Sequence, residues 1–191
     1  MHGRIYADVI GSRQLERPEA LLPTLGDTVR RLNQLFAPGI AAPFVVAYDD
    51  ALHGALTDAV QAPLCVSVLR ELLAPLQVRV GVAVEGSAED AFVVAWHADR
   101  LVHYSGTGEA GDLLLNAFCA LLDPLVLARS EAEWEAVRTV RRHETRTAAA
   151  AELKIGVREL GERLDAGHWQ QVEDADATIA AYLAIALGDS A

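Results

Sequence analysis

The chain has 191 residues, of which 52% are hydrophobic and 23% charged, and its formal net charge is −11. This hydrophobic content is sufficient for a packed core and excludes an intrinsically disordered chain. The acid excess opposes binding to a polyanion unless basic residues gather on one surface. No apolar stretch approaches the ~20 residues that cross a bilayer, and no signal-peptide pattern is present, so we expect a cytoplasmic protein that does not contact a membrane.

Strand and helix patterns alternate along the first 84 residues. In chain order the patterns predict a strand at Arg4–Ile10, a helix at Pro18–Phe36, a loop at Ala37–Pro43, strands at Phe44–Tyr48 and Ala51–Leu56, a helix at Ala59–Leu73 and a strand at Gln77–Val84. The order βαββαβ predicts an α/β (α+β) domain that resembles the ferredoxin-like arrangement, with helices on one face of a mixed sheet.

The second half of the chain has mainly helical patterns. Helices are predicted at Ala88–His103 and Gly111–Leu122, with a mobile glycine-rich connection at 105–111 between them. Beyond that the pattern is entirely helical, so we expect an α/β domain over 1–128 and a helical module over 129–191. The last predicted helix, His168–Leu187, is amphipathic and can cover this module or pair two subunits, which makes a homodimer the expected assembly.

Residues 146–165, RTAAAAELKIGVRELGERLD, fit the packing requirements of a helix-turn-helix. Ala150 is small where two helices cross, and Leu160 and Leu164 recur at the spacing that returns to a shared core. Leu153 and Ile155 flank the turn. Lys154 stands where glycine is usual, so we expect an irregular turn.

Basic residues of this module are the candidate DNA-binding residues, because Arg and Lys contact phosphates and base edges. They are Arg141, Arg142, Arg146, Lys154, Arg158 and Arg163. Glu159, Glu162 and Asp165 lie among them, and the module has more acids than bases. Contact with double-stranded DNA and a purely structural or dimerising role therefore both stay open.

Several segments resemble the SatD family of bacterial proteins. YADVIGSR at 6–13 is similar to the family's GDI-x-x-SR, and PFVVAYDDALHGAL at 43–56 is similar to the segment that contains its GDEFQG. VRVGVAVEG at 78–86 resembles its R-x-G-x-G strand, DAFVVAWHA at 90–98 lies where the family has a PAF-x-x-ARE-A helix, and GHWQQVEDADATIAAYL resembles the tail of many members. The resemblance covers most of the chain.

The resemblance implies a palm-like domain related in shape to nucleotide cyclases and GGDEF proteins, whose carboxylates hold a divalent metal at nucleotide phosphates. The matching positions are Asp8 and Asp50, with Asp49 as the alternative if the register shifts by one. Mg²⁺ suits such a site, because it commonly takes one or two carboxylates plus phosphate oxygens and water. Ser12 and Arg13, after the first strand, can either bind an anion or simply begin the next loop.

Departures from the family pattern count against catalysis. Ala51, Leu52 and His53 replace the family's Glu, Phe and Gln, and Trp96 and His97 replace its Arg–Glu pair. These changes remove groups suited to holding metal and neutralising phosphate. Our first hypothesis is a DNA-binding transcriptional regulator with a degenerate palm domain used for sensing or dimerisation. The alternatives are a Mg²⁺-dependent nucleotide-binding or nucleotidyl-transfer enzyme and a non-catalytic homodimeric interaction protein.

Overall fold

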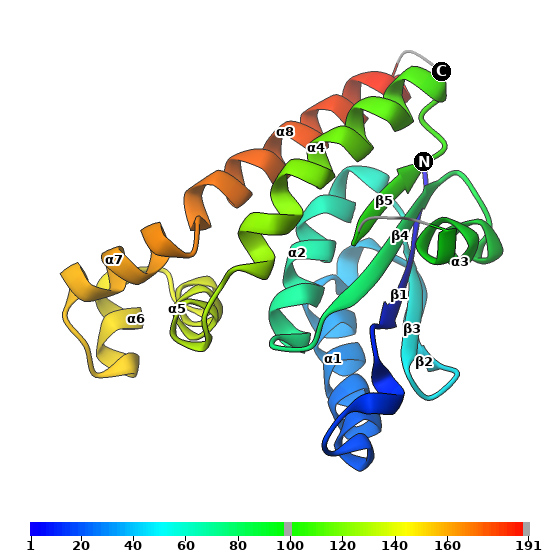
Figure 1. The fold of residues 1–191 in the computed structure, drawn as a ribbon. Coiled ribbons are helices and arrows are strands. Elements are labelled where there is room, and N and C mark those ends of the chain that lie inside the picture. The colour runs from blue at the N-terminus through cyan, green and yellow to red at the C-terminus, as the bar shows by residue number, and fades with distance from the viewer. Residues whose placement is uncertain (98–100, 189–191) are drawn as a thin grey trace.

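The computed structural model describes residues 1–97 and 101–188, which form an α+β fold (Figure 1). Its first part runs β1 (Gly3–Val9), α1 (Leu21–Leu35), β2 (Ile40–Ala47), β3 (Ala51–Leu56), α2 (Ala62–Leu73) and β4 (Val78–Val84). The predicted βαββαβ order is therefore confirmed. It is followed by α3 (Ala88–His97), β5 (Val102–Ser105) and α4 (Glu109–Leu127).

The described strands form one sheet in the order β2-β3-β1-β4-β5, with β1 antiparallel to both neighbours. Side chains of β1 alternate between two layers. Ile5, Ala7 and Val9 face the main core with α1 and α2, whereas Tyr6 packs against α3 on the opposite face. Because side chains alternate along a strand, Asp8 lies on the same face as Tyr6, near the β2–β3 hairpin.

Two predictions were wrong in their boundaries. Residues 102 and 103, predicted as the end of a helix, belong to strand β5, which pairs parallel to β4 and buries Val102 and Tyr104. Strand β2 begins at Ile40, inside the predicted loop and despite Pro43. Proline is tolerated there because β2 lies at the sheet edge and its register to β3 shifts around this residue.

The glycine-rich connection is held by hydrogen bonds, contrary to the predicted mobile segment. The Asp112 carboxylate accepts bonds from the backbone N–H groups of Gly106 (3.1 Å) and Thr107 (2.8 Å) and from the Thr107 hydroxyl (2.7 Å). Asp112 lies in the first turn of α4, where a carboxylate also interacts favourably with the helix dipole. The segment therefore forms an ordered entry into α4.

Helix α4 is the one described helix that is long and apolar enough to cross a membrane by length and composition. In this fold it buries Leu115 and Cys119 in the main core. Its polar residues bind β5 and the residue before it: Asn116 accepts a bond from the Tyr104 N–H, and Asp123 accepts one from the Leu101 N–H. These contacts are those of a core helix.

The remaining helices are α5 (Glu131–Arg142), α6 (Arg146–Leu153), α7 (Val157–Ala166) and α8 (Trp169–Gly188). Helices α5, α6 and α7 enclose a second, separate core, made of Ala136, Val137, Ala149, Ala150, Leu160 and Leu164. Helix α8 leaves this core and runs beside α4, and its Ile179 and Leu183 belong to the main core (Figure 1). The domain division at residue 128 stays a prediction, because α8 packs on both cores.

Candidate functional site

The carboxylates of Asp8 and Asp50 lie at the junction between β1 and the β2–β3 hairpin. The backbone N–H of Val9 donates to the Asp50 carbonyl oxygen over 2.9 Å, which places the hairpin turn beside the end of β1. The Ser12 hydroxyl donates to Asp50 Oδ2 over 2.7 Å. Both side chains are partly buried, and Asp50 is held in place from two sides.

The charges of this pair act on one another. Burial raises the pKa of Asp8, the negative charge of Asp50 raises it further, and Arg79 lowers it. Arg79 stands directly opposite Asp8 in the β1–β4 ladder. Burial is the main reason that the pKa of Tyr6 is raised to about 12, and the negative charges of Asp8 and Asp50 contribute to the increase. Two acids near each other at the end of a strand are suited to bind a cation that relieves their repulsion.

Asp49, the alternative position, lies at the tip of the hairpin turn. Its backbone and that of Tyr48 have φ of 65° and 53°, in the left-handed region that suits a tight hairpin. Asp49 is exposed, and it is Asp50 that raises the pKa of Asp8. The register of the turn therefore pairs Asp8 with Asp50, as the unshifted motif implies.

Asp8 and Asp50 can supply only some of the oxygen ligands that Mg²⁺ needs. Among the described residues no group of three or more His, Cys, Asp or Glu side chains is placed to hold a metal ion. Mg²⁺ accepts one or two protein carboxylates when phosphate oxygens and water complete its shell. Asp8 and Asp50 meet that requirement, and a phosphate-bearing ligand would have to supply the remaining oxygens.

An aromatic cavity of about 420 Å³ lies beside the carboxylate pair, on the α3 face of the sheet. Its lining includes Tyr6, Tyr48, His53 and Phe92. The Phe92 ring meets Tyr6 edge-on at 5.1 Å and stacks on Trp96 at 5.9 Å between ring centroids. The sequence patterns did not reveal this cluster, although Phe92 and Trp96 are four residues apart, the spacing that places side chains on one face of a helix.

Ser12 and Arg13 differ in what they contact. They lie in a short 3-10 helix, Ser12–Gln14, directly after the first strand. The Ser12 hydroxyl is bound to Asp50, so its hydrogen goes to a carboxylate of the protein itself. Arg13 is exposed. Anion binding by these two residues stays a prediction.

Four of the six candidate DNA-binding residues have carboxylate partners. Arg158 bonds Glu162 at 2.9 Å, Arg163 bonds Glu159 at 2.7 Å, Arg142 bonds Glu152, and Arg141 bonds both Glu71 and Glu173. Arg146 and Lys154 are exposed and have no ion-pair partner within the described ranges. Lys154 ends α6 with φ 56°. It therefore adopts the left-handed turn conformation for which glycine is usual.

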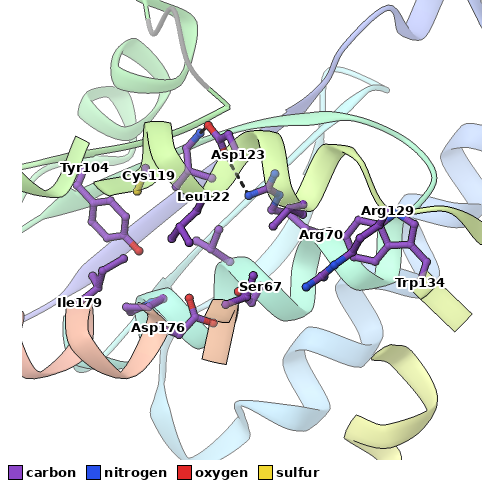
Figure 2. Close-up of a pocket in the computed structure, with 15 residues that line it drawn as sticks. Ser67, Arg70, Tyr104, Cys119, Leu122, Asp123, Arg129, Trp134, Asp176 and Ile179 are labelled. Carbon is purple, nitrogen blue, oxygen red and sulfur yellow. Dashed lines mark hydrogen bonds and ion pairs between the residues drawn. The ribbon is translucent and has the colours of Figure 1, made fainter. Parts of the chain in front are cut away.

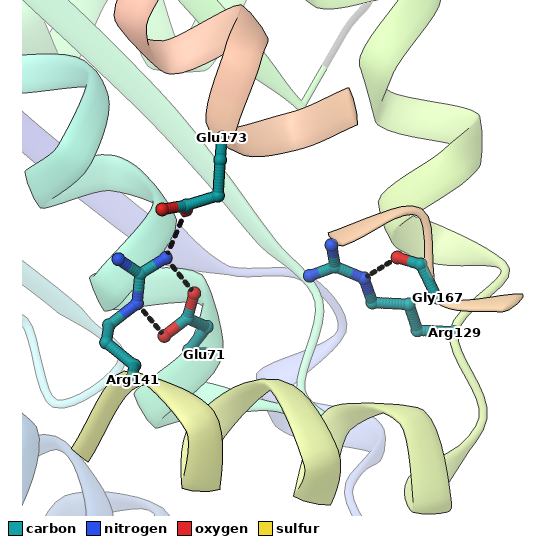
Figure 3. A network of polar contacts seen from close by, with 5 residues as sticks. All are labelled: Glu71, Arg129, Arg141, Gly167 and Glu173. Carbon is teal, nitrogen blue, oxygen red and sulfur yellow. Dashed lines mark hydrogen bonds and ion pairs between the residues drawn. The ribbon is translucent and has the colours of Figure 1, made fainter. Parts of the chain in front are cut away.

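Arg141 joins α5 to α2 and to α8, a structural role that the sequence did not reveal (Figure 3). Its Nε and Nη2 donate to the two oxygens of Glu71 on α2, each over 2.7 Å, and Nη2 also donates to Glu173 on α8. The guanidinium lies over the Trp169 ring, 4.6 Å from its centroid. In Figure 3, Arg129 donates to the Gly167 carbonyl oxygen over 2.6 Å, joining the start of α5 to the start of α8.

A second buried polar group lies where α2, α4 and α8 meet (Figure 2). Arg70 and Asp123 form an ion pair at 3.1 Å. Asp176 of α8 lies beside Ser67 (Figure 2), and its Oδ2 has no hydrogen-bond partner among the residues that the structure describes. Burial raises the pKa of Asp176 to about 7. The adjoining cavity, about 30 Å³, has room for about one water molecule.

Comparisons with known proteins give a similarity to solved structures. No protein-family model and no curated protein sequence matches the chain. The chain is similar to a solved structure described as a regulator of polyketide synthase expression from Bifidobacterium adolescentis, with a TM-score of 0.30 and 14% identity over 95% of this chain and 84% of the other. A similarity at this level transfers no function, so the function of this chain has to be inferred from its own residues.

Proposed function

We propose that the chain is a DNA-binding regulatory protein of the SatD type, in which α6, its turn and α7 form a helix-turn-helix and the α/β domain is a degenerate palm. The observation that supports this most directly is the αL turn at Lys154 between two short helices. Ala149 and Ala150 of α6 lie with Leu160 and Leu164 of α7 in one core, which α5 completes with Ala136 and Val137. Small residues at the crossing allow the close approach that this motif needs.

The proposed DNA surface consists of Arg146, Lys154 and Arg158. Arg146 and Lys154 are exposed without carboxylate partners within the described ranges, and the Arg158 side chain is 92% exposed beside Glu162. An exposed ion pair contributes little to stability, so a DNA phosphate can replace Glu162 as the partner of Arg158 at a small cost in free energy. Arg141 and Arg163 are excluded from this surface, because their side chains are largely buried against carboxylates.

Three phosphate contacts predict weak binding with a clear salt dependence. Neutralising three phosphates gives a slope of about −2.7 for log K against log salt, which is roughly a 40-fold loss of affinity between 50 and 200 mM salt. Fluorescence anisotropy of a labelled random-sequence duplex measures this directly with the full chain. We expect the double substitution Lys154→Gln, Arg158→Gln to weaken binding and to lower the slope.

Arg17→Gln is the matched control, because Arg17 is an exposed arginine in the α/β part and its loss changes the net charge in the same direction. We expect this variant to bind DNA as the natural chain does. Absence of binding at 50 mM salt would contradict the proposal. Equal losses of DNA affinity in Arg17→Gln and in Lys154→Gln or Arg158→Gln alone would also contradict the proposal, because net charge would then explain the effect.

A second candidate function is Mg²⁺-dependent binding of a phosphate-bearing ligand at Asp8 and Asp50. It is favoured by the repulsion between these carboxylates and by the aromatic cavity beside them. Bound Mg²⁺ would neutralise phosphate charge, the Ser12 hydroxyl holds Asp50 in position, and the aromatic rings offer a stacking surface to a base.

Thermal unfolding with ATP and Mg²⁺ tests this second candidate, because a ligand that binds only the folded state raises the midpoint. We expect a rise that needs both components, that Asp8→Asn abolishes and that Asp49→Asn retains. The Asp49 variant is a matched control, since it removes an equal charge one residue from Asp50 in an exposed position. No rise with the natural chain, or equal loss in both variants, would reject it.

A further inference from the structure

A groove of about 690 Å³ lies between α1 and α2 of the α/β part and α5 of the helical part. We propose that this groove binds a small amphiphilic anion, a molecule with one phosphate or carboxylate group and an apolar body. The proposal goes beyond the function proposed above, because the groove includes neither Asp8 and Asp50 nor any residue of α6 or α7. Its volume lies within the ~300–1,000 Å³ of typical small-molecule sites.

Arginine side chains gather at the groove in a protein of net charge −11. Its lining includes four arginines and one acid, namely Arg31, Arg138, Arg141, Arg142 and Glu71. The acid is already bound by Arg141. Arg141 is also bound by Glu173, and Arg142 by Glu152, so the positive charge that no carboxylate of the described residues neutralises lies on Arg31 and Arg138, where it attracts an anion.

Two of the arginines have no carboxylate partner within the described ranges. Arg31 on α1 is exposed, and Arg138 on α5 donates one bond, 3.1 Å long, to the Ala74 carbonyl oxygen. The guanidinium of Arg138 keeps further N–H donors for a ligand, because the side chain has five. Its fixed fork matches a phosphate or carboxylate group.

The rest of the lining is largely apolar. It includes Leu35, Phe36, Leu64, Val68 and Leu72. Leu35 is 62% exposed and Leu64 is 43% exposed, so both leave apolar surface in contact with solvent at the groove. Burying an apolar body there would be favourable in proportion to the apolar area that leaves water.

The combination of charge and apolar surface selects the class of ligand. Inorganic phosphate would satisfy the arginines and leave the leucines in water, and a neutral lipid would do the reverse. An anion with an alkyl or aryl body satisfies both. Arg141 lies against both the groove and the Trp169 ring, so occupancy is expected to change the fluorescence of Trp169.

Calorimetry and tryptophan fluorescence with decyl phosphate, below its micellar concentration, test the proposal on the full chain. We expect one molecule bound per chain, at least tenfold more tightly than inorganic phosphate or decanol. Arg31→Gln and Arg138→Gln should each weaken binding several-fold, and Leu64→Ser should weaken decyl phosphate without affecting inorganic phosphate.

Arg17→Gln is the matched control and should leave binding unchanged, because Arg17 is exposed and lies before α1, outside both the groove and the proposed DNA surface. Equal binding of decyl phosphate and decanol, equal effects of the Arg17 and Arg31 variants, or no binding at all would each overturn the proposal. Arg31 is exposed, so its variant is expected to fold even if the Arg138 variant does not. A dimer that dissociates in the Arg31 variant would assign the groove to a second copy and overturn the proposal.

Discussion

Arg141 on α5 and Glu71 on α2 form an ion pair with two parallel hydrogen bonds of 2.7 Å between residues 70 positions apart in sequence. Glu71 has only 5% of its side chain exposed, and burial raises its pKa, whereas the bonds from Arg141 lower it. Arg141 also bonds Glu173 of α8. One side chain thus joins α5 both to α2 of the α/β part and to α8.

We expect Arg141→Met to destabilise the fold by about 3 kcal/mol, because it leaves the Glu71 carboxylate buried without its cation. Urea unfolding followed by circular dichroism measures the change. Arg158→Met is the control and should leave the free energy of unfolding nearly unchanged, since the Arg158–Glu162 pair is exposed. Adding Glu71→Met to Arg141→Met should recover part of the loss; additive losses would contradict this account.

Asp176 predicts a pH-dependent stability. Its pKa is raised from 3.8 to about 7 in the folded chain, mainly by burial, with Glu173 and Glu71 raising it and Ser67 and Arg141 lowering it. An acid whose pKa is higher in the folded chain than in the unfolded chain stabilises the fold at pH values below its unfolded pKa. This stability is lost as the pH rises through its folded pKa. We expect the free energy of unfolding to fall between about pH 4 and pH 7 through this group, by an amount on the order of a few kcal/mol.

Asp176→Asn isolates that contribution, because the amide does not ionise. We expect the variant to be more stable than the natural chain at pH 8 and to lose this advantage at pH 4. Asp174→Asn is the control and should show little pH-dependent difference, because it removes an equal charge from an exposed position on the same helix, where the side chain accepts a bond from Gln170. Urea midpoints at the two pH values decide the matter, and parallel curves for the Asp176 variant and the natural chain would refute it.

We expect the ionised Asp8 carboxylate to favour the proposed Mg²⁺ binding and to destabilise the metal-free fold. Burial and the charge of Asp50 raise its pKa, so by the same sign its ionised form destabilises the metal-free fold at neutral pH. We expect Asp8→Asn to raise the melting temperature in EDTA at pH 8, with a smaller gain at pH 4. A lower melting temperature at pH 8 would mean that the attraction to Arg79 outweighs the repulsion.

Gly81 on β4 predicts a steric requirement for α3. A Cβ at this position would overlap the carbonyl oxygen of Ala91 and come within 2.7 Å of the Ala95 backbone nitrogen. Gly81→Ala must therefore displace α3, and we expect a loss of about 1–3 kcal/mol in urea unfolding. Gly161→Ala is the control; it has open space on α7 and should stabilise the fold by about 0.5–1 kcal/mol.

Lys154 predicts opposite effects on stability and DNA binding. Its αL backbone favours glycine, so Lys154→Gly should stabilise the chain by about 1 kcal/mol in urea unfolding. The same change removes a proposed phosphate contact and should weaken DNA binding. Lys154→Ala separates the effects, because it removes the charge and keeps the strain. DNA affinity unchanged in both variants would exclude Lys154 from the DNA surface.

Local patterns predicted most elements because their physical cause is local. The alternation in β1, the spacing of leucines in α1 and the small residues of α6 reflect which faces are buried. Strand β5 was missed because its four residues come shortly after an apolar helical pattern. Its identity as a strand depends on pairing with β4 and on bonds from its backbone to α4, which a local pattern does not contain.

The sequence by itself determined the βαββαβ order, the unusual turn at Lys154 and the carboxylates at the end of β1 and in the hairpin. It did not determine which charges meet. Arg141 looked equivalent to Arg146 in sequence, yet it is bound by Glu71 and Glu173, whereas Arg146 is exposed. Tertiary structure alone decided this, because Coulomb interactions depend on separation and burial in space, and the partners of Arg141 come from helices 70 residues before it and 32 after it.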